Sequence, residues 1–171
     1  SNSLAFVGTP TISGVVNLTA GQSITLPNAV YSFTSFSASA RETYVSQNLT
    51  TTGGGANVLT FNGSANLAPL VPAPLTLTSA TTINFNGDVN VNTGGNTLTL
   101  VAATSVNLKQ GTWRQGTNSL AINGGGVAFN IGTATLPQLP ATFNMISGTI
   151  NMAGAGNVTV NRLGTCQVGN P

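Results

Sequence analysis

The chain has 171 residues, enough to bury a substantial core as one domain or as a modest two-domain protein. Charged residues make up 4% of it, against about a quarter in an ordinary domain, and four basic and two acidic residues leave a net charge of +2. The absence of histidine and the single cysteine, Cys166, exclude Ser-His-Asp and Cys-His catalysis, ordinary zinc or copper sites, and a disulfide within this chain.

The remaining polar positions are filled by Thr, Asn, Ser and Gly, and β-branched residues occur throughout. Disordered chains are usually charged and poor in β-branched residues, so this composition predicts a folded, all-β chain. No stretch approaches the roughly 20 apolar residues of a membrane helix, so we expect no membrane insertion by this segment. No charged start followed by an apolar run marks a signal peptide, so we expect a mature form or an excised domain.

Residues 1–55 show no regular period, and we predict an irregular N-terminal cap or edge segment. Terminal repeats of stacked folds are often atypical because they must cover an open strand edge. Within this segment, residues 39–49, SARETYVSQNL, are the best helical candidate and bring together Arg41, Glu42 and Tyr44. A strand with a polar face is the alternative, and we favour a cap or loop over the body of the molecule.

Residues 56–171 contain a repeat in which two apolar-x-apolar pairs are separated by a short polar stretch. The four clear copies begin at Leu75, Leu98, Leu120 and Phe143, so the repeat has a near-constant period of about 23 residues. The paired residues are Leu75/Leu77 with Ile83/Phe85, Leu98/Leu100 with Val106/Leu108, Leu120/Ile122 with Val127/Phe129, and Phe143/Met145 with Ile150/Met152.

A period of this length, with turn-rich stretches such as NTGGN and NGGG between short strands, is typical of a β-solenoid. Each unit forms one coil, alternate residues point inward, and strands of neighbouring coils pair in parallel about 4.8 Å apart. Gly and Asn suit the sharp corners, while outward Thr and Asn side chains can hydrogen-bond along the column. We therefore predict an all-β, single-stranded β-solenoid over residues 56–171. A β-sandwich is the alternative, although sandwich loops vary in length and fit a near-constant period less well.

Two proline clusters interrupt the regular part, one with Pro69, Pro72 and Pro74 and the other with Pro137 and Pro140. Proline cannot donate a backbone hydrogen bond to a strand ladder, so we expect loops that leave the column. Loops on a rigid scaffold are where binding residues usually lie.

The only side-chain carboxylates, Glu42 and Asp88, fall in different predicted regions, the N-terminal segment and a repeat corner. A glycosidase needs two carboxylates placed close together across the sugar. The Gly-rich stretches lack the Lys-Ser/Thr and the helix of a phosphate-binding loop, and the repeats lack the acidic residues of calcium-binding repeats. We therefore expect a non-enzymatic protein with no catalytic residue, no metal and no cofactor. A lyase that uses Lys109 or Arg114 as its base is the minor alternative.

One local cluster, KQGTWRQGT at residues 109–117, has the chemistry of a binding site. Trp113 lies between Lys109 and Arg114, and an aromatic ring flanked by cations can stack on a base or sugar and contact phosphate. The alternative is that Trp113 packs on the column while the cations keep the chain soluble. The candidate ligand-binding residues are therefore Lys109, Trp113, Arg114 and, farther along the chain, Arg162.

The stretch GDVNVNTGGNTLTLVAATSVNL, residues 87–108, resembles the repeats of filamentous-haemagglutinin-like surface proteins. These proteins are right-handed parallel β-helices that bacteria export as adhesins and fibres, and the resemblance covers residues 57–160. It implies a cell-surface location and an adhesive or structural role. A second resemblance is to the β-solenoid domain of minor pilins, including one linked to DNA uptake, although this chain lacks the apolar N-terminal helix of a pilin.

Together these observations lead us to expect an extracellular module that displays a structural or adhesive surface on a cell or filament. Its partners would be other surface or filament subunits, with polysaccharide or DNA as further candidates. The competing hypothesis is a DNA- or polyanion-binding solenoid domain of a pilus-associated protein. A filament subunit that exchanges a strand with its neighbour is a third hypothesis.

Overall fold

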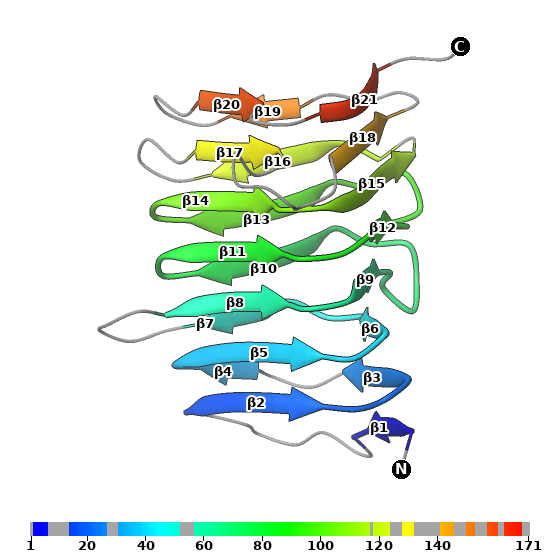
Figure 1. The fold of residues 1–171 in the computed structure, drawn as a ribbon, viewed down its shortest axis with the longest axis vertical. Coiled ribbons are helices and arrows are strands. Elements are labelled where there is room, and N and C mark those ends of the chain that lie inside the picture. The colour runs from blue at the N-terminus through cyan, green and yellow to red at the C-terminus, as the bar shows by residue number, and fades with distance from the viewer. Residues whose placement is uncertain are drawn as a thin grey trace.

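The computed structural model describes residues 2–6, 14–26, 31–51, 57–116, 118–123, 128–131, 141–145, 150–152, 157–160 and 163–168. All regular secondary structure in these ranges is β-strand, and the strands stack into a column with the first and last strands at opposite ends (Figure 1). None of the described residues belongs to a helix of the length and apolarity needed to cross a membrane.

The strands form three sheets, which we name A, B and C, and every pair of neighbouring strands within a sheet is parallel. Sheet A contains, in spatial order, β1 (Ser3–Ala5), β3 (Ser23–Leu26), β6 (Glu42–Val45), β9 (Ser64–Leu67), β12 (Val89–Val91), β15 (Gly111–Gly116), β18 (Ala141–Met145) and β21 (Leu163–Val168). Sheet B contains β4 (Tyr31–Phe33), β7 (Leu49–Thr51), β10 (Leu75–Ser79), β13 (Leu98–Ala102), β16 (Leu120–Asn123) and β19 (Ile150–Met152). Sheet C contains β2 (Val15–Thr19), β5 (Ser35–Ser39), β8 (Val58–Phe61), β11 (Thr82–Phe85), β14 (Ser105–Leu108), β17 (Ala128–Ile131) and β20 (Asn157–Val160).

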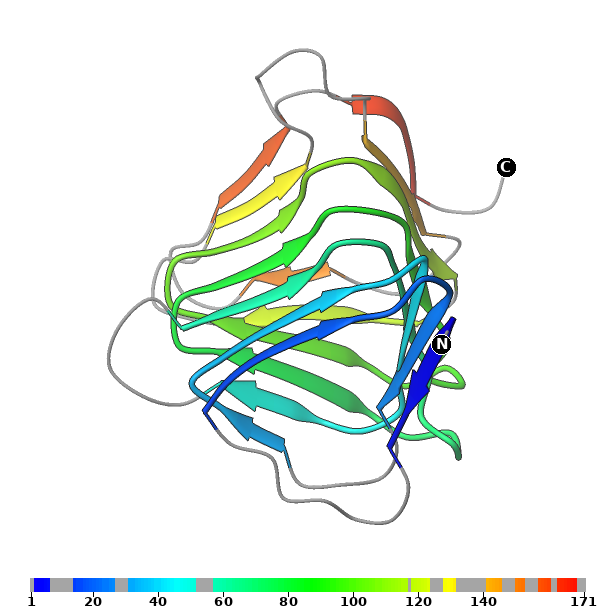
Figure 2. The ribbon, with the colours of Figure 1, turned by 60° about the horizontal axis from the view of Figure 1, so that its bottom comes forward.

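The path of the chain confirms the predicted β-solenoid. From β4 onward, a strand of sheet B is followed by one of sheet C and one of sheet A, and the chain then returns to sheet B one level higher. The turn is right-handed (Figures 1 and 2), as crossovers between parallel strands usually are. Leu75 pairs directly with Leu98, as the repeat predicts. The alternative β-sandwich is therefore not the fold. The fourth copy of the repeat is wrong, because Leu120 pairs with Ile150 and not with Phe143.

The described residues within the segment 1–55, which we predicted to form an irregular cap or edge segment, contribute strands to the same three sheets. Strand β2 pairs with β5, and β5 pairs with β8, without a break in sheet C. Because Val16 pairs with Phe36 and Ile24 pairs with Thr43, one coil at this end takes up about 20 residues. The coils in the middle of the column take up about 23 residues, and the coil after β16 takes up about 30. This difference in coil length is why the sequence showed no constant period in this segment.

The segment 39–49, our best helical candidate, forms the end of β5, strand β6 and the start of β7. In β6 the side chains alternate, with Thr43 and Val45 buried and Tyr44 exposed. The alternative of a strand with a polar face is therefore correct, and the favoured cap or loop is wrong. A helix and a strand would each bury part of this short segment, so its apolar residues do not distinguish between them. The pairing of β6 with β3 and β9 makes the segment a strand.

The inward side chains of the three sheets fill a continuous apolar core, as alternation predicts. A series of aromatic rings runs up this core, each 4.9 to 5.9 Å from the next between ring centroids. The series consists of Phe33, Phe36, Phe61, Phe85, Trp113 and Phe129. Burial of these large rings, together with the aliphatic side chains around them, stabilises the column.

At the corner between sheets C and A, one position in each of three successive coils has no room for a side chain. Gly63, Gly87 and Gly111 stack there, one per coil, and a Cβ atom built on Gly87 would lie 2.7 Å from the carbonyl oxygen of Gly63. At the corner between sheets A and B, Gly94 and Gly95 of the NTGGN turn have φ angles of 67° and 85°, which glycine adopts without strain. Asparagine was also expected to take such conformations, but among the described residues only glycines have positive φ.

The first proline cluster lies in a loop between β9 and β10, as predicted. Leu70 and Val71 in this loop are 75% and 69% exposed. The second cluster, Pro137 and Pro140, lies outside the described residues, so that prediction stays open.

Candidate functional site

Four of the five charged side chains in the described part of the chain lie on sheet A or directly before one of its strands. Glu42 and Arg114 belong to β6 and β15, while Arg41 and Asp88 come directly before β6 and β12. Lys109 lies in the turn between β14 and β15. The described strands of sheets B and C carry no charged residue. Winding the chain therefore gathers charges that are scattered in the sequence onto one face, which is the candidate functional site.

A row of outward side chains runs up this face through the centres of the strands. Successive residues in the row are paired across neighbouring strands, and the row consists of Thr25, Tyr44, Asn66, Asn90 and Arg114. Neighbours in the row are about 4.8 Å apart at the backbone. Successive coils therefore place mostly different side chains at the same position of the face.

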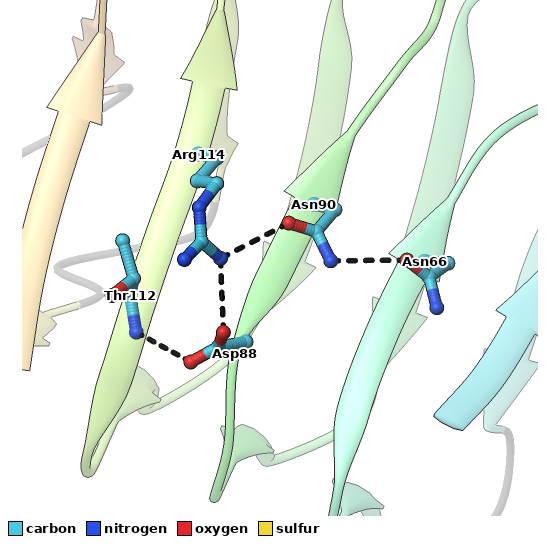
Figure 3. Close-up of polar contacts among 5 residues, drawn as sticks. All are labelled: Asn66, Asp88, Asn90, Thr112 and Arg114. Carbon is cyan, nitrogen blue, oxygen red and sulfur yellow. Dashed lines mark hydrogen bonds and ion pairs between the residues drawn. The ribbon is translucent and has the colours of Figure 1, made fainter. Parts of the chain in front are cut away.

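In the middle of the row, four side chains form one hydrogen-bonded network (Figure 3). The Nη1 of Arg114 lies 2.9 Å from Oδ2 of Asp88 and 3.2 Å from Oδ1 of Asn90. Asn90 in turn donates from Nδ2 to Oδ1 of Asn66 at 3.0 Å. The Arg114 and Asp88 side chains are 50% and 38% exposed, so this ion pair contributes roughly 0–1 kcal/mol.

The pKa of Asp88 is lowered from its ordinary value of 3.8 by its surroundings. Burial by itself would raise this pKa, but the backbone N–H of Thr112, 2.9 Å from Oδ1, and the guanidinium of Arg114 outweigh that effect. Asp88 is therefore ionised near neutral pH and holds Arg114 along the face.

Tyr44 has a large aromatic side chain with 41% of its surface open to solvent. Its hydroxyl donates a hydrogen bond to Oε2 of Glu42. The pKa of Tyr44 is raised, first by this hydrogen bond and then by slight desolvation and the negative charge of Glu42. The ring is thus held in place by its hydroxyl while its faces stay accessible.

A shallow hollow lies on each side of the Tyr44 ring. The first, of about 320 Å³, has mostly polar walls formed by Gln22, Ser23, Arg41, Glu42 and Tyr44. The second, of about 380 Å³, has mostly apolar walls formed by Thr25, Tyr44, Ser46, Ala68 and Leu70. We refer to the two hollows together as the Tyr44 groove.

The structure brings two of the predicted ligand-binding residues close together in the fold, but not on a common binding surface. Lys109 is exposed in the turn before β15, and its backbone N–H donates to the carbonyl of Phe85 at 2.9 Å. Arg114 is on the outer face of β15, paired with Asp88. Arg162 lies outside the described residues. The binding role of these residues stays a hypothesis.

Trp113 points into the column and is fully buried. Its ring contacts Phe85 and Phe129 edge to face, and Nε1 donates to Oε1 of Gln115 at 2.7 Å. Trp113 is therefore part of the core, which was the alternative interpretation of the KQGTWRQGT cluster. Its position follows from strand alternation, because an inward residue lies between the outward residues Thr112 and Arg114.

Glu42 and Asp88, which we expected in different regions, lie on the same sheet with only β9 between their strands. Their backbones are about 10 Å apart, two strand spacings, and each carboxylate has its own partner, Tyr44 or Arg114. Within the described ranges, no group of three or more His, Cys, Asp or Glu side chains is placed to hold a metal ion.

Sequence reasoning missed Tyr44 as a site residue, since it was placed in a cap segment without a period. The repeat itself held the missing signal. Tyr44, Asn66, Asn90 and Arg114 follow one another at intervals of about 23 residues, which is the length of one coil. Extending the repeat toward the N-terminus would have placed these residues in one row.

Comparisons with protein-family models, with curated proteins and with solved structures gave no match to this chain. The site is therefore interpreted from its own geometry.

Proposed function

We propose that this chain is a non-enzymatic structural or adhesive module displayed on a cell surface or filament. The observation that carries the proposal is the surface of sheet C, where equivalent residues of successive coils form a ladder of neutral amides. Asn107 donates from Nδ2 to Oδ1 of Asn84 at 2.8 Å, and Asn130 donates to Oδ1 of Asn107 at 2.7 Å. Such a ladder fixes its side chains in one orientation and stiffens the stack of coils.

A stiff column with neutral faces suits a passive role at a surface. The side chains of the ladder lose little freedom on contact, because they are already ordered, so contact costs less entropy than with mobile side chains. Neutral faces also avoid long-range repulsion between neighbouring copies. The resemblance to filamentous-haemagglutinin-like repeats supports the same role and an extracellular location.

The polyanion-binding hypothesis receives less support from the geometry. Arg114 is neutralised by Asp88, and Trp113 is buried, so neither presents its predicted chemistry freely to a nucleic acid. Lys109 alone remains as an exposed cation of that cluster in the described structure. A binding surface for polyanions usually gathers several unpaired cations.

The two hypotheses differ in their response to salt. Beads coated with the purified chain are tested for adhesion to one another, to polysaccharide-coated surfaces and to DNA-coated surfaces, from about 50 to about 200 mM salt. We expect adhesion to other copies or to polysaccharide that changes little over this range. Polyanion binding would instead weaken with a slope of about −0.9 per phosphate neutralised. Adhesion to DNA alone, with such a slope and lost in Lys109→Ala, would overturn the proposal.

A further inference from the structure

The Tyr44 groove combines an exposed ring with one polar and one apolar wall. A purely apolar patch would favour a hydrophobic ligand, and a purely polar patch would favour an ion. Here the apolar wall of Ala68 and Leu70 faces the same ring as the polar wall of Arg41 and Glu42. A ligand that fits must itself have an apolar side and a polar edge.

The charges in the groove favour a neutral ligand. Arg41 and Glu42 are adjacent and opposite in sign, so the polar hollow has no net charge. A polyanion would be repelled by Glu42 and a polycation by Arg41. The neighbouring pair of Asp88 and Arg114 farther up the face is also neutral as a unit.

A sugar ring has this combination of properties. Its C–H face packs on an aromatic ring, while its hydroxyls donate to a carboxylate and accept from a guanidinium or amide. Tyr44 supplies the ring, Glu42 the acceptor, and Arg41 and Gln22 the donors. Ser46 and Thr25 add hydroxyls on the second side of the ring.

The groove is long enough for more than one sugar. It follows β6 from Glu42 to Ser46, a distance of about 13 Å at about 3.3 Å per residue. A further hollow, lined by Gln47, Asn48 and the proline loop, lies next to it, since both hollows share Ser46 and Leu70 as wall residues. Prolines restrict the backbone of this loop, so the wall is largely formed before a ligand arrives.

We propose that the Tyr44 groove binds a neutral oligosaccharide chain lying along β6, with a sugar ring stacked on Tyr44. This inference names the ligand class of the adhesive role and rests on that proposed function.

The test is affinity electrophoresis of the full chain through gels that contain dextran, xylan, galactomannan or acidic polygalacturonate. We expect at least one neutral polysaccharide to retard the chain more than polygalacturonate does. Tyr44→Ala should weaken this binding roughly 3- to 10-fold, the range expected for loss of an aromatic stack. Tyr44→Phe keeps the ring but loses the hydrogen bond to Glu42, and should bind more weakly than the wild type but more tightly than Tyr44→Ala.

Val15→Ala serves as the matched control, because Val15 is 66% exposed on β2, away from the groove. Glu42→Gln should also weaken binding, since an amide is a poorer acceptor for sugar hydroxyls than a carboxylate. Circular dichroism and thermal unfolding should be unchanged in all these variants, since the altered groups are on the surface.

Absence of retardation by all three neutral polysaccharides, or equal retardation of Tyr44→Ala and wild type, would overturn the groove proposal. If the bead assay still shows adhesion in that case, the adhesive role stands and uses another surface. If the gels give the expected pattern but the beads do not adhere, the groove stands and the adhesive role fails.

Discussion

The outer faces of sheets A and C have the same backbone architecture but opposite surface chemistry. On sheet C, one position repeats the same residue in three successive coils, Asn84, Asn107 and Asn130, joined amide to amide. On sheet A, the corresponding central row changes at almost every coil and includes Tyr44 and Arg114.

The difference shows what a solenoid fixes and what it leaves free. Inward residues must fill the core, and corner residues must allow close approach, but outward residues meet only their neighbours in the next coil. Repetition on sheet C is accounted for by stability, since identical amides satisfy one another. On sheet A this amide pairing is limited to Asn66 and Asn90 in the described strands, and the positions that vary are where we look for recognition.

The largest effect should come from the core that supports both faces. Trp113→Ala removes a ring that contacts Phe85 and Phe129, and we expect a loss of about 3–5 kcal/mol in the free energy of unfolding. Chemical denaturation followed by circular dichroism measures it. Trp113→Phe should lose less of this free energy, because it keeps a ring in the core. It should still be less stable than the wild type, because Oε1 of Gln115 loses its hydrogen-bond donor. Wild-type stability in Trp113→Ala would contradict the buried position of the indole.

The corner that joins the two faces should be the next most sensitive point. Gly87→Ala places a Cβ atom within 2.7 Å of the Gly63 carbonyl oxygen, and we expect destabilisation of about 1–3 kcal/mol. Gly21→Ala is the matched control, since its Cβ would lie 3.7 Å from Oδ1 of Asn2, an ordinary contact. Equal melting temperatures of the two variants would show that the coils are not closely stacked at this corner.

The ladder of sheet C should matter for stability and not for binding. Asn107→Ala removes the hydrogen bonds donated to Asn84 and Ser105 and the one accepted from Asn130, and we expect a loss of about 1–2 kcal/mol in the free energy of unfolding. Asn92→Ala, at an exposed position next to β12, should have almost no effect. Retardation by neutral polysaccharide should be the same in both. A loss of binding in Asn107→Ala alone would move the recognition surface to sheet C.

The smallest effect should be a response to acid that is confined to sheet A. The pKa of Asp88 is lower in the folded chain than its ordinary value of 3.8, so its contribution to stability is present above that value. It is lost as pH falls through 3.8 toward the lower, folded pKa. Because the ion pair is half exposed, the loss should be at most about 1 kcal/mol.

Asp88→Asn isolates this contribution. The melting temperature of the variant should fall less than that of the wild type as the pH falls below 4, since one titrating group is gone. An identical acid response in variant and wild type would show that Asp88 is not stabilised by Arg114 and Thr112.

The residues that the sequence predicted best are those governed by local alternation. Leu75, Leu98 and Leu120 are buried and stacked as expected, because a strand whose inner face is apolar can pair in only one register without exposing it. The loop with the first proline cluster was also predicted, because proline has no backbone N–H to donate to a strand ladder. The period was not a guide where coil length changed. The first coils are shorter, and the coil after β16 is longer, so that Leu120 pairs with Ile150 where the period placed Phe143.

The sequence by itself determined a charge-poor stack of parallel coils, because the period of the apolar residues specifies which side chains must be buried together. Only the tertiary structure decided that Arg41, Glu42, Asp88 and Arg114 share one face and that Trp113 does not. The reason is physical: outward residues are not constrained by the core. Which outward residues become neighbours depends on the length of each coil and on which residues of each strand face outward. Both follow only from the folded structure.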